Sequence, residues 1–306
     1  MSIDRVVDIA ENGQHLSLYR GFLLVSRDRE EVGRVPLDDI SALIVHGHGT
    51  TLSANLIAAL AERSVFGVIC GSNHQPVACL WPLSGHHAQG ERMRAQLAAG
   101  LPLKKRLWRQ LVQAKIRTQA AVLNAAGQSS EALDHMARRV RSGDPENVEA
   151  QAARRYWPSL MGLEFRRDRE REGANALLNY GYAVMRAACA RAIVASGLHP
   201  TVAVHHSAGH NDFALADDLI EPFRPYVDMS VRNMVLAGCE TVDADAKLQL
   251  AGILAEDLHM PHGVSPVSVA VRRVAHSLAT NFRDGTSALD LPTPPPPVQL
   301  AAFGRA

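Results

Sequence analysis

Three short stretches of the sequence carry side chains that could hold a divalent metal ion. The first contains Glu149, in an N-V-E run, the second the pair His205-His206, and the third the acids Asp218 and Glu221. Carboxylate oxygens are the ligands that Mg²⁺ and Mn²⁺ prefer, and a histidine nitrogen moves the preference toward Mn²⁺ or later metals. Such a site can activate water or a hydroxyl group and neutralise charge on a phosphoryl oxygen.

Each stretch also has an ordinary explanation without a ligand. A single glutamate on a helix is commonly solvated, and a histidine pair commonly belongs to the core or the surface. Adjacent histidines point in different directions, so at most one of His205 and His206 would be a ligand. Asp218 and Glu221 are three positions apart, which on a helix places both on one face. There they would form a solvated acidic face, or share a cation that relieves their repulsion.

Glu149, His206 and Glu221 together would make a mixed oxygen and nitrogen ligand set. They are 57 and 15 positions apart, so only the tertiary fold can bring them together. The sequence contains no G-x-x-x-x-G-K-[ST], G-x-G-x-x-G or G-x-S-x-G motif. Chemistry that uses ATP, NAD or a serine nucleophile in a strand–helix elbow is therefore not expected.

Basic residues are concentrated in the middle of the chain, although the net charge of its 306 residues is only +1. Residues 101–200 carry 17 basic and 9 acidic side chains, whereas residues 201–306 carry 7 and 12. Chance partition is one explanation of this asymmetry, and contact with phosphates is the other. The basic clusters that would contact a DNA backbone are Lys104, Lys105, Arg106, Arg138, Arg139, Arg154 and Arg155. Residues 166–171 alternate arginines with acids and predict a salt-bridged surface helix. No helix-turn-helix, zinc-finger or RNP signature is present, so recognition would be of backbone, ends or shape.

The elements that must position these residues fall into two parts. Up to residue 83, short strands are separated by turn residues and interrupted by one helix capped by Ser53. The strands are expected at 5–9, 15–19, 21–26, 32–36, 40–45, 65–70 and 77–80, with a turn at 73–76. This pattern predicts an N-terminal, β-rich and sandwich-like domain over residues 1–83. A linker is expected at 84–90, after which the hydrophobic period changes from two to about 3.6.

Residues 91–287 predict an all-α C-terminal domain, so the fold class is α+β with two domains. A helix is expected to open at Asp144-Pro145, with Pro in its first turn, and to end near Pro158. Other helices are expected at 104–124, 174–196, 214–223, 244–258 and 266–282, and a short strand or buried entry at 201–204. A Pro-rich tail is expected at 288–306, and within it residues 292–298 are expected to be exposed and extended.

Composition favours a globular protein in a reducing cytoplasm. Hydrophobic residues make up 47% of the chain and charged residues 21%. The start does not resemble a signal peptide, and no uncharged apolar run is long enough to cross a membrane. The four cysteines form no C-x-x-C pair, so neither a zinc ribbon nor a disulfide framework is expected.

Two sequence runs are specific enough to indicate a family. They are L-N-Y-G-Y at 178–182 and D-L-I-E-P-F-R-P at 218–225. They occur together with L-W-R-Q-L-V-Q-A-K-I at 107–116 and a strand–helix–strand pattern at 40–76. In these features, and over nearly its whole length, the chain resembles the CRISPR-associated integrase and endonuclease of spacer acquisition, in the form found in type II systems.

The resemblance implies a helical catalytic domain and a β-rich domain that forms a homodimer. It implies Mg²⁺ or Mn²⁺ held by Glu149, His206 and Glu221, with Asp218 as a supporting acid. His205 is the alternative to His206, because a histidine doublet can be aligned one residue apart. The loop 205–212, H-H-S-A-G-H-N-D, departs from the bulkier or more basic residues of many relatives. Its contacts with DNA are therefore open.

The implied reaction is the insertion of a new spacer into a CRISPR array, the adaptation step of antiviral defence. A DNA 3′-hydroxyl would attack a phosphodiester at the repeat boundary. The implied partners are double-stranded DNA, as protospacer and repeat, and a small ferredoxin-like protein whose dimer bridges two homodimers. Two alternatives are compatible with the sequence: a non-catalytic DNA-binding scaffold, and a stand-alone metal nuclease that acts on branched DNA in repair.

Overall fold

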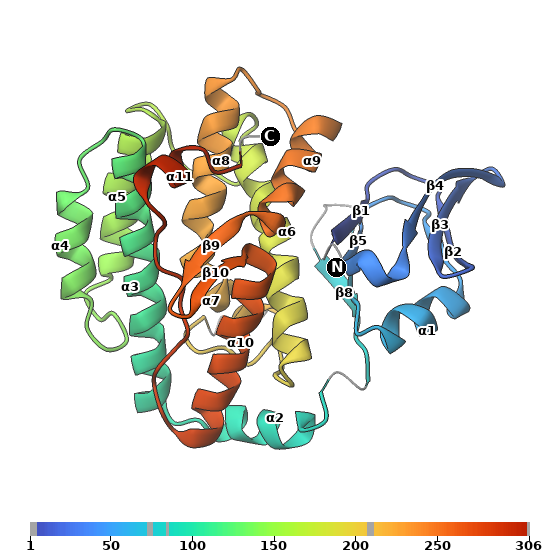
Figure 1. Cartoon of the computed structure of the whole chain (residues 1–306), viewed down its shortest axis with the longest axis horizontal. Coiled ribbons are helices and arrows are strands. Elements are labelled where there is room, and N and C mark those ends of the chain that lie inside the picture. Colours follow the sequence, from blue (N-terminus) through green and yellow to red (C-terminus); the bar gives the residue numbers. More distant parts are fainter. Residues whose placement is uncertain (1–4, 72–75, 84–85, 207–210, 305–306) are drawn as a thin grey trace.

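The chain folds into two parts, a smaller one rich in strands and a larger helical one (Figure 1). The structure, a computed structural model, describes residues 5–71, 76–83, 86–206 and 211–304. The two-domain α+β class predicted from the sequence is confirmed. The predicted turn before Pro76 lies outside the described residues. The exact domain boundaries stay predictions.

Two four-stranded sheets form the N-terminal part. In the first, of order β1-β5-β7-β8, the first three strands are parallel and β8 is antiparallel to β7. Its strands are β1 (Arg5–Ile9), β5 (Ile40–Val45), β7 (Phe66–Cys70) and β8 (Pro76–Leu80). The second sheet, of order β4-β3-β2-β6, contains an antiparallel meander. Its strands are β4 (Glu30–Pro36), β3 (Phe22–Arg27), β2 (His15–Tyr19) and β6 (Thr51–Leu52).

The core of this part comes from alternating apolar residues of the two sheets and from one face of helix α1 (Ala54–Glu62). Leu16, Leu23, Leu43 and Leu56 are fully buried there. The predicted cap is confirmed, because Ser53 Oγ accepts a hydrogen bond from the Leu56 amide at 3.3 Å. The strand spacing therefore predicted the other strands to within about two residues, but it did not predict β6.

The helical part is built on two long helices, α3 (Leu101–Ala125) and α6 (Ala174–Ala195). The remaining α-helices are α2 (Gln89–Ala98), α4 (Glu131–Arg139), α5 (Val148–Met161), α7 (Ala214–Leu219), α8 (Arg224–Leu236), α9 (Ala244–Gly252), α10 (Val267–Asp284) and α11 (Pro297–Ala301). Shorter elements are the 3-10 helices η1 (Leu37–Asp39), η2 (Glu221–Phe223) and η3 (Ile253–Ala255), and the hairpin of β9 (Asp257–Met260) and β10 (Gly263–Pro266).

Helix α6 lies in the interior, as its nearly continuous apolar sequence predicts. Gly181 allows α8 to approach closely, because a Cβ at this position would lie 2.5 Å from Val227 Cγ1. The same helix contacts the N-terminal part, where Tyr180 donates a hydrogen bond to Asp8 Oδ2 at 3.1 Å. Of the helices in the described residues, none has the length and apolarity needed to cross a membrane.

Several predicted boundaries in the helical part are wrong. Helix α5 begins at Val148 and not at Pro145, because Asp144 and Asn147 adopt left-handed conformations with φ of 47° and 51°. It also continues through Pro158 to Met161. The helix expected at 214–223 is divided into α7 and η2, and α8 follows directly. The helix expected at 244–258 ends at Gly252 and is followed by η3 and β9. Residues 166–171 form a loop, and residues 201–204 form a turn in which only Val204 is buried.

The predicted exposed and extended segment at 292–298 is confirmed only in part, because Thr293 and residues 296–298 are exposed but Pro292 and Pro295 are buried and a helix begins at Pro297. Leu300 and Phe303 are buried, and residues 297–301 form α11. Asn233 on α8 donates hydrogen bonds to the carbonyl oxygens of Ala301 and Phe303 at 3.2 and 3.1 Å. The apolar residues at the end of the tail thus fix it to the helical part, although prolines dominate the segment before them.

Candidate metal centre

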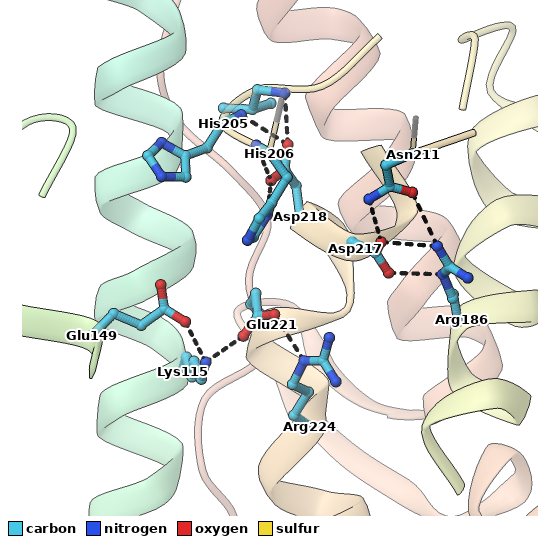
Figure 2. Close-up of polar contacts among 11 residues, drawn as sticks. Lys115, Glu149, Arg186, His205, His206, Asn211, Asp217, Asp218, Glu221 and Arg224 are labelled. Atoms are coloured by element: carbon cyan, nitrogen blue, oxygen red, sulfur yellow. Dashed lines mark hydrogen bonds and ion pairs between the residues drawn. The ribbon is translucent and has the colours of Figure 1, made fainter. Parts of the chain in front are cut away.

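Two of the predicted ligands, Glu149 and Glu221, contact Lys115, which is not among the predicted site residues. Glu149 lies in the first turn of α5, Glu221 opens η2, and Lys115 projects from α3 between them (Figure 2). Lys115 Nζ lies 2.5 Å from Glu149 Oε1 and 2.5 Å from Glu221 Oε2. The fold therefore brings the two carboxylates to one shared cation.

The turn before α5 fixes the position of Glu149. The backbone amides of Val148 and Glu149 donate hydrogen bonds to the two carboxylate oxygens of Asp144, at 2.9 and 3.0 Å. Asn147 caps the same helix through its side chain, which accepts from the Ala150 amide at 3.3 Å. A carboxylate at a helix N-terminus satisfies free amides and complements the helix dipole. Glu149 thus extends from a tightly held first turn toward Lys115.

Glu221 is a buried anion with two cationic neighbours. Its side chain is only 5% exposed, and Arg224 Nε donates to Oε1 at 2.8 Å. Burial alone would raise the pKa of Glu221, but the Arg224 guanidinium and the Lys115 ammonium outweigh it and lower the pKa to about 2. Glu221 is therefore ionised at any physiological pH. Its Oε2 atom receives no well-directed hydrogen bond from a described residue and lies 2.5 Å from Lys115 Nζ.

The two carboxylates in turn keep Lys115 charged. Burial alone would lower its pKa, but the charges of Glu221 and Glu149 outweigh burial and raise it. An ammonium group in this position replaces water as the partner of two partly or fully buried carboxylates.

Asp218 holds the loop that carries the histidines. It is fully buried and accepts hydrogen bonds from the backbone amides of Val204, His205 and His206 at 2.6, 2.9 and 3.1 Å. His206 Nδ1 lies 2.7 Å from the same carboxylate, which raises the pKa of this histidine. With Nδ1 donating to Asp218, the neutral ring keeps its lone pair on Nε2, the arrangement common for metal-binding histidines.

The two histidines point in different directions, as predicted. The His205 ring stacks on Trp108 of α3, with centroids 4.2 Å apart and planes 5° apart, and burial lowers its pKa. The His206 ring lies on the side of Glu149 and Glu221 (Figure 2). Of the two alternatives, His206 is therefore the one placed toward the carboxylates.

As they stand, no three His, Cys, Asp or Glu side chains in the described residues are close enough to share one metal ion. Asp218 and Glu221 do not form the solvated acidic face that was one alternative, because both are buried. The other alternative, a cation shared by the two, stays a prediction; in this structure loop amides contact the Asp218 carboxylate, and Lys115 and Arg224 contact that of Glu221. The donor chemistry nevertheless fits a divalent ion. Two carboxylate oxygens already face one positive charge, and one of them lacks a directed hydrogen bond. Lys115 would have to move for the ion to bind.

Glu149, His206, Glu221 and Lys115 line a cavity of about 1270 Å³ whose walls carry both basic and acidic side chains. The acids that line it are Glu149, Asp212, Asp217, Glu221 and Asp228. The basic residues that line it are Lys115, Arg167, Arg169, Arg186, Arg224 and Lys247. None of these was selected from the sequence as a DNA contact. The seven basic residues that were selected lie outside the cavity lining, at the start of α3, the end of α4 and the middle of α5. Their role as backbone contacts stays a prediction.

A second buried acid lies in the same cavity wall. Asp228 on α8 accepts hydrogen bonds from the hydroxyl groups of Tyr156, at 3.0 Å, and Tyr182. Burial raises the pKa of Asp228 to about 6. The guanidinium groups of Arg224 and Arg167 lie 4.6 and 5.5 Å from the centre of the Tyr182 ring. The L-N-Y-G-Y run contains Tyr182, but nothing in the sequence indicated its partner.

The fold thus joins a β-rich domain to a helical domain, and paired carboxylates lie in a cavity that also carries basic side chains. The chain belongs to the Cas1 family: residues 7–256 match the family described as CRISPR associated protein Cas1. The family predicted from the sequence is therefore confirmed.

The comparisons with individual proteins agree with this assignment. The chain is 39% identical to the CRISPR-associated endonuclease Cas1 of Neisseria meningitidis serogroup C (strain 8013) over 232 residues, which is 75% of this chain and 76% of that one. A casposase bound to its integration product shares the fold with a TM-score of 0.78, at 21% identity, over 94% of this chain and 92% of that one. A Cas6-RT-Cas1–Cas2 complex gives a TM-score of 0.74, at 16% identity, over 95% of this chain and 36% of that one.

Proposed function

We propose that the protein is a metal-dependent DNA integrase and endonuclease that inserts new spacers into a CRISPR array. The observation that carries the proposal is the convergence of Glu149 and Glu221 on one cation position, in a cavity that His206 also lines. Membership of a family of CRISPR-associated endonucleases supports it. The shared fold with a casposase that was solved with its integration product is consistent with strand transfer.

In this proposal Glu149, Glu221 and His206 hold Mg²⁺ or Mn²⁺. When bound, the ion polarises a phosphoryl oxygen and favours deprotonation of an attacking hydroxyl. Glu221 supplies a permanent negative charge, since its pKa is about 2. His206 offers Nε2 because Asp218 holds Nδ1 and the loop amides. Asp218 therefore acts as a positioning residue for the histidine.

The cavity cations position the DNA. Arg167 and Arg224 lie beside Tyr182 at the wall that holds Glu221, so a phosphate that enters the cavity meets positive charge next to the reacting site. Alignment of a 3′-hydroxyl with the phosphodiester makes the attack effectively unimolecular. Water in place of the hydroxyl would give nicking instead of strand transfer.

The partners follow from the same proposal. The substrate is double-stranded DNA, as protospacer and repeat, and the exposed Arg138, Arg139, Arg154 and Arg155 would contact its backbone outside the cavity. The β-rich domain would form the homodimer, and a small ferredoxin-like partner dimer would bridge two homodimers. The shared fold with a chain of a complex that contains Cas2 supports a partner of this kind.

The test is strand transfer on a labelled, repeat-like branched DNA in Mn²⁺. Glu149→Ala and His206→Ala should each lower the rate by about 100-fold or more, because each removes a metal ligand. Glu131→Ala is the matched control, since Glu131 is an exposed glutamate in the first turn of α4 and lies outside the cavity lining. Unchanged melting temperatures and DNA affinities would assign the loss to chemistry, whereas full activity of Glu149→Ala would refute the site.

The alternatives give different results in this assay. A DNA-binding scaffold would bind the DNA equally well with EDTA and form no product in Mn²⁺. A stand-alone repair nuclease would cut branched DNA without a partner and without preference for repeat-like sequence.

A further inference from the structure

Lys115 occupies the position between the carboxylates that a divalent ion would need. Its ammonium is 2.5 Å from one oxygen of Glu149 and 2.5 Å from one oxygen of Glu221. Its side chain is 11% exposed, so little water competes for it. An ammonium and a divalent ion repel each other strongly at such short range, so the two cannot occupy the pair together.

A second side chain on the same helix face has an unused acceptor. Gln119 is one turn further along α3, which places its Cβ about 5–6 Å from that of Lys115. It is 3% exposed, and its Oε1 atom has no hydrogen-bond donor among the described residues. A buried acceptor without a donor costs about 1–3 kcal/mol. Both side chains line the same cavity, and the four-carbon lysine stem can span one helical turn.

We propose that Lys115 is a resident counter-cation of Glu149 and Glu221, that a divalent ion must displace it, and that Gln119 Oε1 accepts the displaced ammonium. This inference rests on the proposed metal site. In the metal-free protein, Lys115 is the cation that the two carboxylates share. Without it Glu221 would keep only Arg224, and the partly buried Glu149 would lose its recorded ion pair. When a divalent ion enters, the lysine changes partner on its own helix, and the acceptor that lacked a donor gains one.

The exchange has a cost for metal affinity. Part of the attraction between the ion and the carboxylates is used to break two close ion pairs. Removal of the lysine charge should therefore tighten metal binding. Removal of the Gln119 acceptor should weaken it, because the displaced ammonium then lacks a partner in the cavity.

The test measures the Mn²⁺ dissociation constant of the full, DNA-free chain by titration calorimetry and by the electron paramagnetic resonance of free Mn²⁺. Lys115→Met should lower the constant roughly tenfold or more, since it removes a competing charge. Lys115→Arg should stay within about threefold of the unaltered chain, because the charge remains. Gln119→Leu should raise the constant about threefold or more, because the ammonium loses its acceptor.

Lys247→Met is the matched control. Lys247 lines the same cavity, but its ammonium lies over the Tyr180 ring, 5.7 Å from the centroid. Its loss should leave Mn²⁺ affinity within about twofold. Equal or weaker Mn²⁺ binding by Lys115→Met would overturn the inference.

Thermal unfolding keeps the test decisive if Lys115→Met is unstable without metal. Mn²⁺ should then raise the melting temperature of this variant more than that of the unaltered chain, since ligand binding stabilises the folded state. An equal or smaller increase contradicts displacement. Glu149→Gln separates the two claims. If Glu149→Gln leaves Mn²⁺ affinity unchanged, the proposed metal site is wrong. If Glu149→Gln weakens Mn²⁺ binding but Lys115→Met does not tighten it, only the lysine exchange is rejected.

Discussion

Glu221 and Asp228 are two buried carboxylates in the wall of one cavity, yet their charges are controlled in opposite directions. They are seven positions apart in the sequence and 4% and 1% exposed. Glu221 contacts two cations, which lower its pKa to about 2. Asp228 contacts two tyrosine hydroxyls, and burial raises its pKa to about 6. The neighbouring groups, and not burial alone, therefore decide the charge of each carboxyl group.

The difference suits two different tasks. A carboxylate that is ionised at every physiological pH can always bind a metal ion, whereas a carboxyl group that titrates near neutrality is a poor metal ligand. Asp228 instead joins three helices, because Tyr156 lies on α5, Tyr182 on α6 and Asp228 itself on α8. We therefore expect the same neutral substitution at the two positions to give very different results.

The largest contrast should be in activity. Glu221→Gln should lower Mn²⁺-dependent strand transfer about 1,000-fold, because it removes a ligand charge. Asp228→Asn should lower it less than about tenfold, because the residue only holds the wall in place. A comparison of single-turnover rates on the branched DNA measures both. Similar losses in the two variants would contradict the division of tasks.

The next contrast is in stability. Glu221→Gln leaves Lys115 and Arg224 with less negative charge in a buried site, and loss of one partner of a buried ion pair costs about 3–5 kcal/mol. Asp228→Asn keeps the polar group and removes only a costly buried charge, so its free energy of unfolding at pH 7 should change by about 1 kcal/mol or less. Urea unfolding in EDTA checks both. A larger loss for Asp228→Asn would reverse the comparison.

A smaller effect concerns pH. The pKa of Asp228 is raised from 3.8 to about 6 in the folded state, so folding favours its protonated form. The stability that this shift contributes is fully present below pH 3.8 and is lost as the pH rises through 6. Relative to the unaltered chain, Asp228→Asn should therefore gain on the order of 1–3 kcal/mol between pH 4 and pH 7. Unfolding curves at several pH values measure this difference, and a constant difference would show that Asp228 does not titrate there.

The smallest effect should come from the tyrosines. Both hydroxyls lower the pKa of Asp228, and that of Tyr182 does so more. Tyr182→Phe should therefore raise the Asp228 pKa by about one unit, and Tyr156→Phe by less. Carboxyl carbon chemical shifts across a pH titration give the values, and an unchanged pKa in Tyr182→Phe would mean that its hydrogen bond does not stabilise the charge.

The sequence predicted the fold better than the site. Alternation and period identified the strands and the long helices α3 and α6, because buried faces leave regular patterns. The start of α5 was misplaced because two left-handed residues form a turn that composition does not mark. The exposure of residues 292–298 was predicted only in part, because Pro292 and Pro295 are buried and the chain beyond them is anchored by the buried Phe303. In each case one local conformation or one anchoring side chain overrode the average pattern.

The carboxylates of the site could be named from the sequence, but their cation could not. Lys115 is one of several basic residues on α3, and its burial depends on Glu149 and Glu221 from distant parts of the chain. Asp228 was missed for the same reason, since its two hydroxyl partners come from α5 and α6. Long-range pairing of charges leaves no periodic signal.

The four hydrogen bonds to Asp218 affect how an inactive variant at this position should be interpreted. Asparagine has nearly the same shape as aspartate, but only one of its two terminal atoms is an oxygen. It could therefore accept either from the amides of Val204 and His205 or from His206, but not from all of them. Asp218→Asn, the usual conservative choice, would therefore disturb the backbone that presents His206. An assay of that variant would report on the folding of a loop, and its failure should not be counted as the loss of a metal ligand.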